Sequence, residues 1–237
     1  MLDPAKSAWG DIFDLYTARY PSLLAMALDW WSFNYPLLRF VQQVSDGQRI
    51  LEVGCGEGMQ SSLFAMHGYD VTCVDVHEAM LLRTRKLLGS LGLPGTYICA
   101  DAWDLPIQKP YERAAFDIVF TGGLLEHFSE KDGTALLREL SHYGEMLITN
   151  VPTPAGQKGD PQEALDMAPV RKMTAPRLWR MYLDAGLTDI RLRAFGNPGG
   201  WRTALRAVLP GAVWHALQVG GNCGCSLVIS GRRRYDE

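Results

Sequence analysis

Short apolar runs alternate with helical patterns through most of the chain. Seven runs suit buried strands, at 49–53, 69–75, 96–99, 116–120, 145–150, 188–195 and 223–230. Apolar residues that recur every three or four positions predict helices between them, at 59–67, 79–91, 130–143 and 175–185. Strands that alternate with helices in this way predict an α/β fold with a largely parallel sheet. The basic tail that follows the last strand from Gly231 is expected to be solvated.

The first 47 residues carry a different pattern, in which aromatic residues are frequent. Three helical runs are predicted here, at 9–18, 22–31 and 35–44. Pro21 and Pro36 each stand near a helix start, which suits proline. The segment either packs onto the rest of the domain or forms a helical lid, a substrate cap, over an apolar pocket. Trp31, Phe33 and Tyr35 are the candidate pocket residues, because they lie around the predicted turn between two helices.

A second unusual segment, 197–222, precedes the last strand. Its apolar residues fall on one side of a helix, at Trp201, Ala204, Leu205, Val208 and Leu209. We expect a helical insertion that packs beside the aromatic N-terminal segment, so that Trp201 helps to wall an apolar pocket. The alternative is a helix that lies on an anionic membrane through Arg202 and Arg206. Two arginines and a net charge of −3 favour the first interpretation.

Composition bounds the classes of protein to which the chain can belong. With 237 residues, 47% of them hydrophobic and 21% charged, the chain suits one globular domain with additions. The net charge of −3 argues against nucleic acid as a partner. The five cysteines show neither a zinc-ligand spacing nor a disulfide framework, so we expect no metal and a cytoplasmic location. We expect no signal peptide and no integral membrane segment, because no suitable apolar stretch occurs.

The candidate chemistry centres on residues 49–58, which read RILEVGCGEG. A predicted strand ends at Val53, glycines follow at 54, 56 and 58, and a helical pattern starts directly after them. Glycine suits positions where φ is positive or where a ligand presses against the backbone. A strand, a glycine turn and a helix in this order predict a nucleotide site at the carboxyl end of the strand.

The glycine spacing narrows the choice of nucleotide. Met59 and Ser61 stand where a dinucleotide fingerprint G-x-G-x-x-G needs its third glycine, and no lysine completes a phosphate-binding loop. Asp75 ends the second strand, 21 residues after Gly54, where a carboxylate accepts hydrogen bonds from ribose hydroxyls. Its alternative role is to cap the following helix. Asp101 follows the third strand, where a carboxylate suits an exocyclic amine.

The pattern E-x-G-x-G-x-G at 52–58 resembles motif I of the class I S-adenosylmethionine (SAM) methyltransferases. Asp75, Asp101 and the run GGLLEHF at 122–128 extend the resemblance over 48–195 and point to the small-molecule, type 11-like branch. The fold that this implies is a Rossmann-like, seven-stranded, mostly parallel sheet with an antiparallel last strand and helices on both faces. The implied organisation is a SAM-binding domain at 48–237 within a single overall domain, with the lid and the helical insertion as additions.

The resemblance also implies where SAM, and its product S-adenosylhomocysteine (SAH), bind. The implied cofactor-binding residues lie in the glycine corner and after the second, third and fourth strands: Glu52, Gly54, Cys55, Gly56, Gly58, Asp75, Val76, Asp101, Ala102, Trp103, Gly122 and Gly123. In the family, the acidic residue after the third strand meets the adenine amino group, and the next backbone N–H meets a ring nitrogen.

The implied activity is methyl transfer to an oxygen or nitrogen of a small, partly apolar metabolite. An oxygen acceptor needs its proton removed, and His127 is the candidate base because histidine titrates near neutral pH. The alternative role of His127 is to shape the cofactor pocket. A nucleic-acid methyltransferase is disfavoured, because TGGL at 121–124 replaces an Asn/Asp-Pro-Pro-aromatic motif. A lipid-like or membrane-associated acceptor and a non-catalytic SAM-binding relative stay open as alternatives.

Overall fold

The computed structural model describes residues 18–107, 115–153, 171, 173–196 and 226–233, and every structural statement below concerns this part of the chain. Two predictions lie outside the described residues. These are the first N-terminal helix at 9–18, of which only residue 18 is described, and the helical insertion at 197–222 with Trp201.

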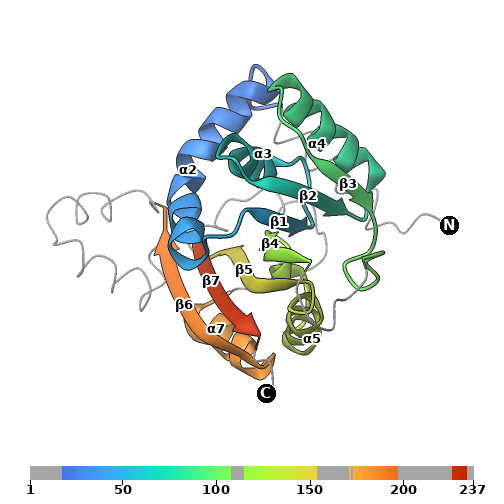
Figure 1. Ribbon diagram of the computed structural model, residues 1–237. Coiled ribbons are helices and arrows are strands. Elements are labelled where there is room, and N and C mark those ends of the chain that lie inside the picture. Colours follow the sequence, from blue (N-terminus) through green and yellow to red (C-terminus); the bar gives the residue numbers. More distant parts are fainter. Residues whose placement is uncertain (1–17, 108–114, 154–170, 172, 197–225, 234–237) are drawn as a thin grey trace, which may run out of the picture.

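In the described part of the chain, seven strands form one sheet in the order β3-β2-β1-β4-β5-β7-β6 (Figure 1). The strands are β1 Arg49–Val53, β2 Asp70–Asp75, β3 Thr96–Cys99, β4 Phe116–Gly122, β5 Gly144–Pro152, β6 Leu187–Phe195 and β7 Ser226–Arg233. The first five strands pair in parallel, whereas β7 runs antiparallel to both β5 and β6. The predicted fold class is therefore confirmed, including the antiparallel last strand.

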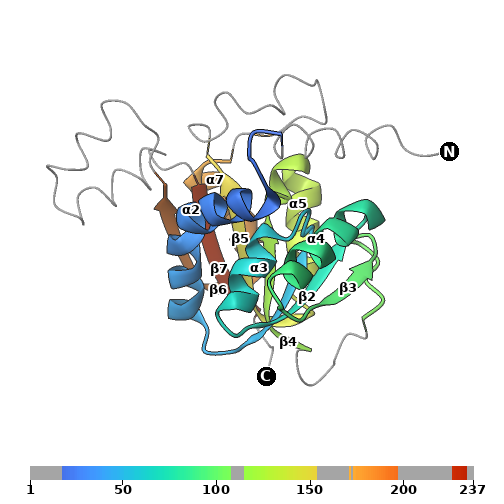
Figure 2. The same ribbon diagram turned by 90° about the horizontal axis from the view of Figure 1, so that it is seen from above.

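Helices cover both faces of the sheet (Figures 1 and 2). One face carries α2 Leu23–Val44, α3 Met59–Met66 and α4 Glu78–Ser90, and the other carries α5 Glu130–Leu140 and α7 Ala175–Asp184. Successive side chains of a strand point to opposite faces, so Ile50 packs with α2, α3 and α4, whereas Leu51 packs with α5 and α7. This alternation produces two apolar layers, one on each side of the sheet.

The predicted break between the helices at 22–31 and 35–44 is wrong, because α2 is continuous from Leu23 to Val44 and contains Pro36. Proline removes one backbone hydrogen bond and normally costs about 3 kcal/mol inside a helix. In α2 this cost is opposed by burial on both sides of the proline, since Ala27, Leu38 and Val41 are fully buried in the layer that covers the sheet. Packing of one long apolar face therefore outweighs the local stop signal.

The prediction of a solvated tail from Gly231 is also wrong. β7 continues to Arg233, pairing with Leu187 of β6, and Gly231 is buried. A Cβ atom at Gly231 would lie 3.0 Å from Cδ1 of Tyr182, so the aromatic ring of α7 packs directly on this part of the strand. Arg232 is exposed on this part of β7, whereas its neighbour Gly231 is buried. The basic sequence was therefore mistaken for a tail although it belongs to a strand.

Tyr182 supplies a polar contact inside the second apolar layer. Its side chain is fully buried, and its hydroxyl donates to Oγ1 of Thr149 at 2.8 Å, which in turn lies 3.1 Å from Oγ1 of Thr121. We expect Tyr182→Phe to lower the free energy of unfolding by about 1 kcal/mol, because the Thr149 hydroxyl loses one partner. Urea unfolding followed by circular dichroism measures this. Tyr97→Phe, a partly exposed tyrosine on β3, is the control and should change the stability by less than about 0.5 kcal/mol.

Candidate functional site

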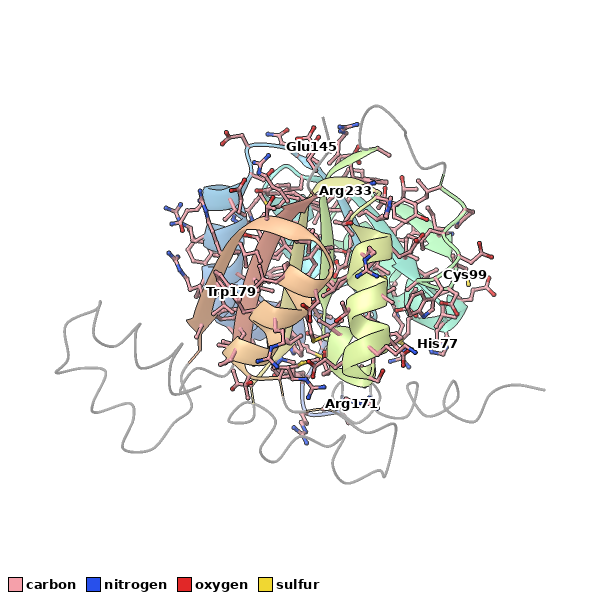
Figure 3. All side chains as sticks on the ribbon, turned by 90° about the horizontal axis from the view of Figure 1, so that it is seen from below. His77, Cys99, Glu145, Arg171, Trp179 and Arg233 are labelled. Carbon is pink, nitrogen blue, oxygen red and sulfur yellow. The ribbon has the colours of Figure 1, made fainter. Side chains whose placement is uncertain are left out.

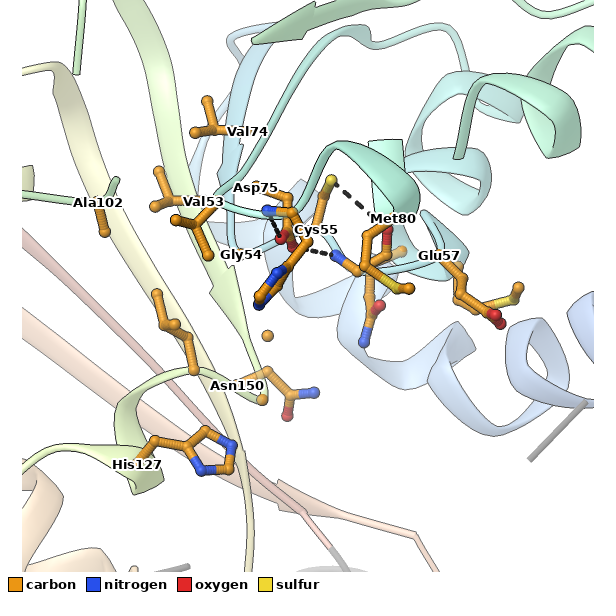
Figure 4. Close-up of a pocket in the computed structure, with 18 of the residues that line it drawn as sticks. Val53, Gly54, Cys55, Glu57, Val74, Asp75, Met80, Ala102, His127 and Asn150 are labelled. Carbon is orange, nitrogen blue, oxygen red and sulfur yellow. Dashed lines mark hydrogen bonds between the residues drawn. The ribbon is translucent and has the colours of Figure 1, made fainter. Parts of the chain in front are cut away.

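A cavity of about 570 Å³ lies at the carboxyl ends of the parallel strands. Figure 3 shows His77 and Arg171 at the edge of the molecule opposite Glu145 and Arg233, which lie at the start of β5 and at the end of the antiparallel β7. Residues at or after the carboxyl ends of β1, β2, β3, β4 and β5 line the cavity (Figure 4), together with one side of α2. Ligand sites for small molecules have volumes of about 300–1,000 Å³, so the cavity has room for one or two small ligands.

The glycine corner forms the floor of the cavity. Gly54, Gly56 and Gly58 have φ values of 75°, 53° and 77°, in the left-handed region that favours glycine. The backbone N–H groups of Gly54 and Cys55 both donate to the carbonyl of Val74, which ties the turn to β2. Gly54, Cys55 and Gly56 line the cavity, whereas Gly58 lies beneath it as the N-cap of α3. The turn therefore presents backbone, with little side chain, to a ligand.

Asp75 joins the glycine corner to the end of β2. Its Oδ2 accepts from the N–H of Gly56 and its Oδ1 from the N–H of His77, both at 2.9 Å. Each carboxylate oxygen has a second lone pair that a ligand hydroxyl can use. Burial raises the pKa of this carboxyl above its usual range, although the two backbone N–H groups oppose that rise. Asp75 thus performs part of the predicted capping role, because His77 is the N-cap of α4, and still lines the cavity.

Glu52 lies behind the glycine corner and does not line the cavity. Its side chain is buried on the face of β1 that meets α3, and it accepts a short hydrogen bond from the hydroxyl of Ser61. Burial is the main cause that raises the pKa of Glu52 well above its usual range, and the nearby Cys73 adds to it. Through its hydrogen bond with Ser61, the carboxyl of Glu52 connects β1 with α3, and it supports the ligand site only indirectly.

The loop after β3 closes one end of the cavity. Asp101, Ala102 and Trp103, which the sequence assigned to the cofactor site, all line it, and so does Val76 after β2. Oδ1 of Asp101 accepts from the N–H of Trp103 at 3.0 Å, which fixes the loop. The indole of Trp103 meets the ring of Phe128 edge to face at a centroid distance of 6.1 Å. These two rings connect the β3 end of the cavity with the segment that follows β4.

The segment after β4 brings Gly122, Gly123 and His127 to the cavity. His127 ends the short 3-10 helix Leu125–His127, and its ring faces the cavity (Figure 4). Arg171 holds this turn from outside, since its backbone N–H donates to the carbonyl of Glu126 and its Nη1 to the carbonyl of His127, both at 2.9 Å. Two hydrogen bonds from Arg171 therefore hold the backbone that carries the imidazole.

The four candidate residues for the substrate pocket have different positions. Phe33 lines the cavity, and its ring lies 5.7 Å from that of Phe195. Trp31 instead packs against α3, where its Nε1 donates to Oγ of Ser62 at 3.0 Å. Tyr35 is half exposed and lies against His67, and neither Trp31 nor Tyr35 lines the cavity. Trp201 lies outside the described residues.

Sequence reasoning missed the residues of α2 that do face the cavity, namely Met26, Trp30 and Asn34. They stand four residues apart, so a helix that continues past residue 31, as α2 does, places them on one side with Phe33. The signal was present in this spacing, and the assumed turn between the helices at 22–31 and 35–44 separated Asn34 and Phe33 from Met26 and Trp30. Sequence reasoning also missed Asn150 and Ser226, which reach the cavity from β5 and β7.

Among the described residues, no group of three or more His, Cys, Asp or Glu side chains is arranged to hold a metal ion. None of the described helices is both long enough and apolar enough to cross a membrane.

Comparison with known proteins gives a consistent result. Residues 50–143 match the methyltransferase domain family. The ubiquinone biosynthesis O-methyltransferase of Coxiella burnetii is 32% identical over 114 residues, which cover 43% of this chain and 47% of that protein. The protein-L-isoaspartate O-methyltransferase of Cytophaga hutchinsonii is 32% identical over 72 residues, which cover 30% of this chain and 33% of that protein. The chain therefore spans between a third and about half the length of these curated relatives.

The fold also has solved counterparts. The magnesium protoporphyrin IX methyltransferase of Synechocystis PCC 6803 with bound SAH matches with a TM-score of 0.59 at 14% sequence identity, covering 91% of this chain and 89% of that chain. At this level of identity the match concerns the fold. Together with the strand order, it confirms the fold that the glycine corner and the acidic strand ends predicted.

Proposed function

Because the chain carries a methyltransferase domain at residues 50–143 within a class I SAM-dependent methyltransferase fold, we propose that it is a SAM-dependent methyltransferase. It transfers a methyl group to an oxygen or nitrogen of a small, partly apolar metabolite. The observation that carries this proposal is a single cavity that runs from Asp101 and Asp75 to His127 and Asn150. Such a cavity holds a nucleotide-like donor and a second small molecule side by side.

The residues at the β1, β2 and β3 ends fit SAM. Asp75 keeps lone pairs for the ribose hydroxyls, Asp101 is exposed to the cavity for the adenine amine, and Gly54 and Gly56 let the ligand approach the backbone. When bound, SAM supplies an electrophilic methyl group on a positively charged sulfur. The protein's own tasks in catalysis are then to position the acceptor, to exclude water and to remove a proton where the acceptor requires it.

The acceptor side of the cavity lies between the ends of β4 and β5 and the face of α2. Met26, Trp30 and Phe33 give this side an apolar wall, which supports the proposal that the N-terminal segment acts as a substrate cap. Both curated relatives named above are O-methyltransferases, which favours oxygen as the acceptor atom. The alternative of a lipid-like acceptor depended on residues 197–222, outside the described part of the chain, and stays open. The cytoplasmic location stays a prediction.

Asp75→Ala tests the cofactor site directly. We expect the affinity for SAH, measured by titration calorimetry, to fall by on the order of 1–3 kcal/mol, because the ribose hydroxyls lose their acceptor. Since burial raises the pKa of Asp75 and hydroxyl donors favour its ionised form, the affinity of the wild type should fall as the pH drops through that raised pKa. Asp70→Ala, at the exposed opposite end of β2, is the control and should bind SAH like the wild type. Equal affinity of Asp75→Ala and the wild type would refute the site assignment.

Catalysis is tested separately with methyl-labelled SAM and a metabolite extract as the source of acceptor. The proposal requires that label passes to a small organic molecule and that Asp75→Ala slows the transfer at low SAM concentration. Tight SAH binding without any labelled product would support the alternative of a non-catalytic SAM-binding relative.

A further inference from the structure

Asn150 places an amide where the strand pattern calls for an apolar residue. Along β5 the side chains of Met146 and Ile148 enter the apolar layer that α2 and α3 cover. Asn150 comes next on the same face, because side chains of a strand alternate with a period of two. It lies at the carboxyl end of β5, paired with Gly122 of β4 and Val228 of β7, and it lines the cavity.

The amide of Asn150 is 7% exposed and buries its Oδ1 completely, with no hydrogen-bond partner for that atom. A buried amide oxygen without a partner destabilises a folded protein relative to an apolar side chain of similar size. Nδ2 is then the amide atom that faces the cavity, and Figure 4 shows the side chain directed into the space on the same side as His127. β5 thus presents one hydrogen-bond donor, Nδ2 of Asn150, to the cavity, while the buried Oδ1 of the same amide lowers the stability of the fold.

Asn150 and His127 border the same end of the cavity. The N–H of Gly123 donates to the carbonyl of Asn150 at 3.0 Å. This hydrogen bond joins the start of the segment that carries His127 to the backbone of Asn150. Among the described residues that line the cavity there is no Lys or Arg side chain. A negative charge that develops on an acceptor oxygen at this end therefore has no Lys or Arg side chain to stabilise it, and the amide supplies a hydrogen-bond donor.

The number of lone pairs then separates oxygen from nitrogen acceptors. A neutral amine has one lone pair, which the methyl transfer itself consumes, so it has none left to accept a hydrogen bond from Nδ2. A hydroxyl oxygen has two lone pairs, and it can accept from Nδ2 with one while the other attacks the methyl group.

We propose that Asn150 binds the reacting oxygen of the acceptor through Nδ2, and that the acceptor is a hydroxyl compound with an apolar body that lies along Met26, Trp30 and Phe33. This inference rests on the proposed function. His127 takes the hydroxyl proton, the oxygen forms a bond to the methyl carbon, and the bond from that carbon to sulfur breaks, leaving SAH. The oxygen, which becomes negative as its proton leaves, is neutral again in the methyl ether.

The probe is 4-nitrophenol, whose ionisation near neutral pH is followed by its visible absorbance. It is titrated with the protein saturated with SAH, for the wild type, Asn150→Leu and Asn150→Asp. A donor on the phenolate oxygen favours the ionised form. We therefore expect the wild type to bind the phenolate about tenfold more tightly than Asn150→Leu, with the apparent pKa of the bound probe lowered by about one unit. Asn150→Asp should bind the phenolate no better than Asn150→Leu, because an ionised carboxylate has no donor.

Controls separate this inference from the proposed function. SAH affinity should be the same in all variants, and Asn150→Leu should unfold at the same or a higher temperature than the wild type. Ser230→Ala removes another buried oxygen without a hydrogen-bond partner, on β7 and away from the cavity, and should leave the probe unaffected. Failure of the wild type to bind SAH would refute the proposed function. SAH binding without probe binding, equal probe ionisation in the wild type and Asn150→Leu, or tighter binding by Asn150→Asp would overturn only the role of Asn150.

Discussion

Replacing His127 with Gln is expected to lower kcat for a hydroxyl acceptor about 100-fold while the Kd for SAH stays within about twofold. A positioned general base contributes about 10²–10⁴-fold to a rate, and Gln has no group that takes up a proton near neutral pH. The imidazole lines the cavity, and Arg171 holds its backbone from outside, so the effect should come from lost chemistry and not from a displaced turn. Initial rates with labelled SAM over a range of acceptor concentrations separate kcat from KM.

The pH dependence gives a second measurement of the same role. The variant should regain activity as the pH rises, because the acceptor hydroxyl then ionises without help. His142→Gln is the matched control. His142 follows α5, its Nδ1 lies 2.8 Å from the carbonyl oxygen of Arg138, and it does not line the cavity. A parallel loss of SAH binding in His127→Gln would show that the imidazole only shapes the pocket.

Replacing Gly58 with Ala is expected to lower the free energy of unfolding by about 3 kcal/mol. Gly58 has a φ of 77°, and a Cβ atom there would lie 2.4 Å from Cγ2 of Thr84, far inside van der Waals contact. Left-handed backbone at a residue other than glycine costs about 1 kcal/mol, and forcing an extra carbon into a packed site typically adds 1–3 kcal/mol. Thr84 has little freedom to move, because its hydroxyl donates to the carbonyl of Gly56 at 2.7 Å. Urea unfolding of the two proteins measures the difference.

Gly68 supplies the comparison that isolates the close approach. Its φ of 85° is equally unsuited to alanine, yet nothing lies within 4 Å of the Cβ position. Gly68→Ala should therefore cost only about 1 kcal/mol. Equal losses for the two variants would mean that backbone strain alone matters and that the contact between the glycine corner and α4 does not.

Local patterns predicted most of the fold, because periodicity and turn residues act over a few positions. Strand β3 was predicted at its observed bounds, and the helices α3, α4 and α7 were each predicted to within about two residues. The glycine corner was also predictable, since positive φ at Gly54, Gly56 and Gly58 is a property of each residue's own backbone. The polar residues at the ends of β2 and β3 could be placed because the carboxyl ends of parallel strands meet at one edge.

Errors arose where tertiary packing outweighed a local signal. Pro36 suits the start of a new helix on local grounds, yet the apolar face of α2 continues on both sides of it and is buried against the sheet. The same error placed Phe33 and Asn34 in a turn, apart from Met26 and Trp30, so the side of α2 that these residues share was not recognised as part of the site. The end of β7 was missed because Gly231 and Arg232 have the sequence of a polar tail. They belong to a strand only because β5 and β6 pair with β7 on either side.

The sequence by itself determined the α/β fold, the glycine corner and the acidic strand ends, because neighbouring residues suffice to specify a strand, a turn and a helix start. Only the tertiary structure decided what each side chain contacts. It placed the carboxylate of Asp75 on two backbone N–H groups, Glu52 behind the cavity, and Asn150 beside the segment that carries His127. These contacts join residues on different strands and helices, and their distances depend on how the sheet packs as a whole.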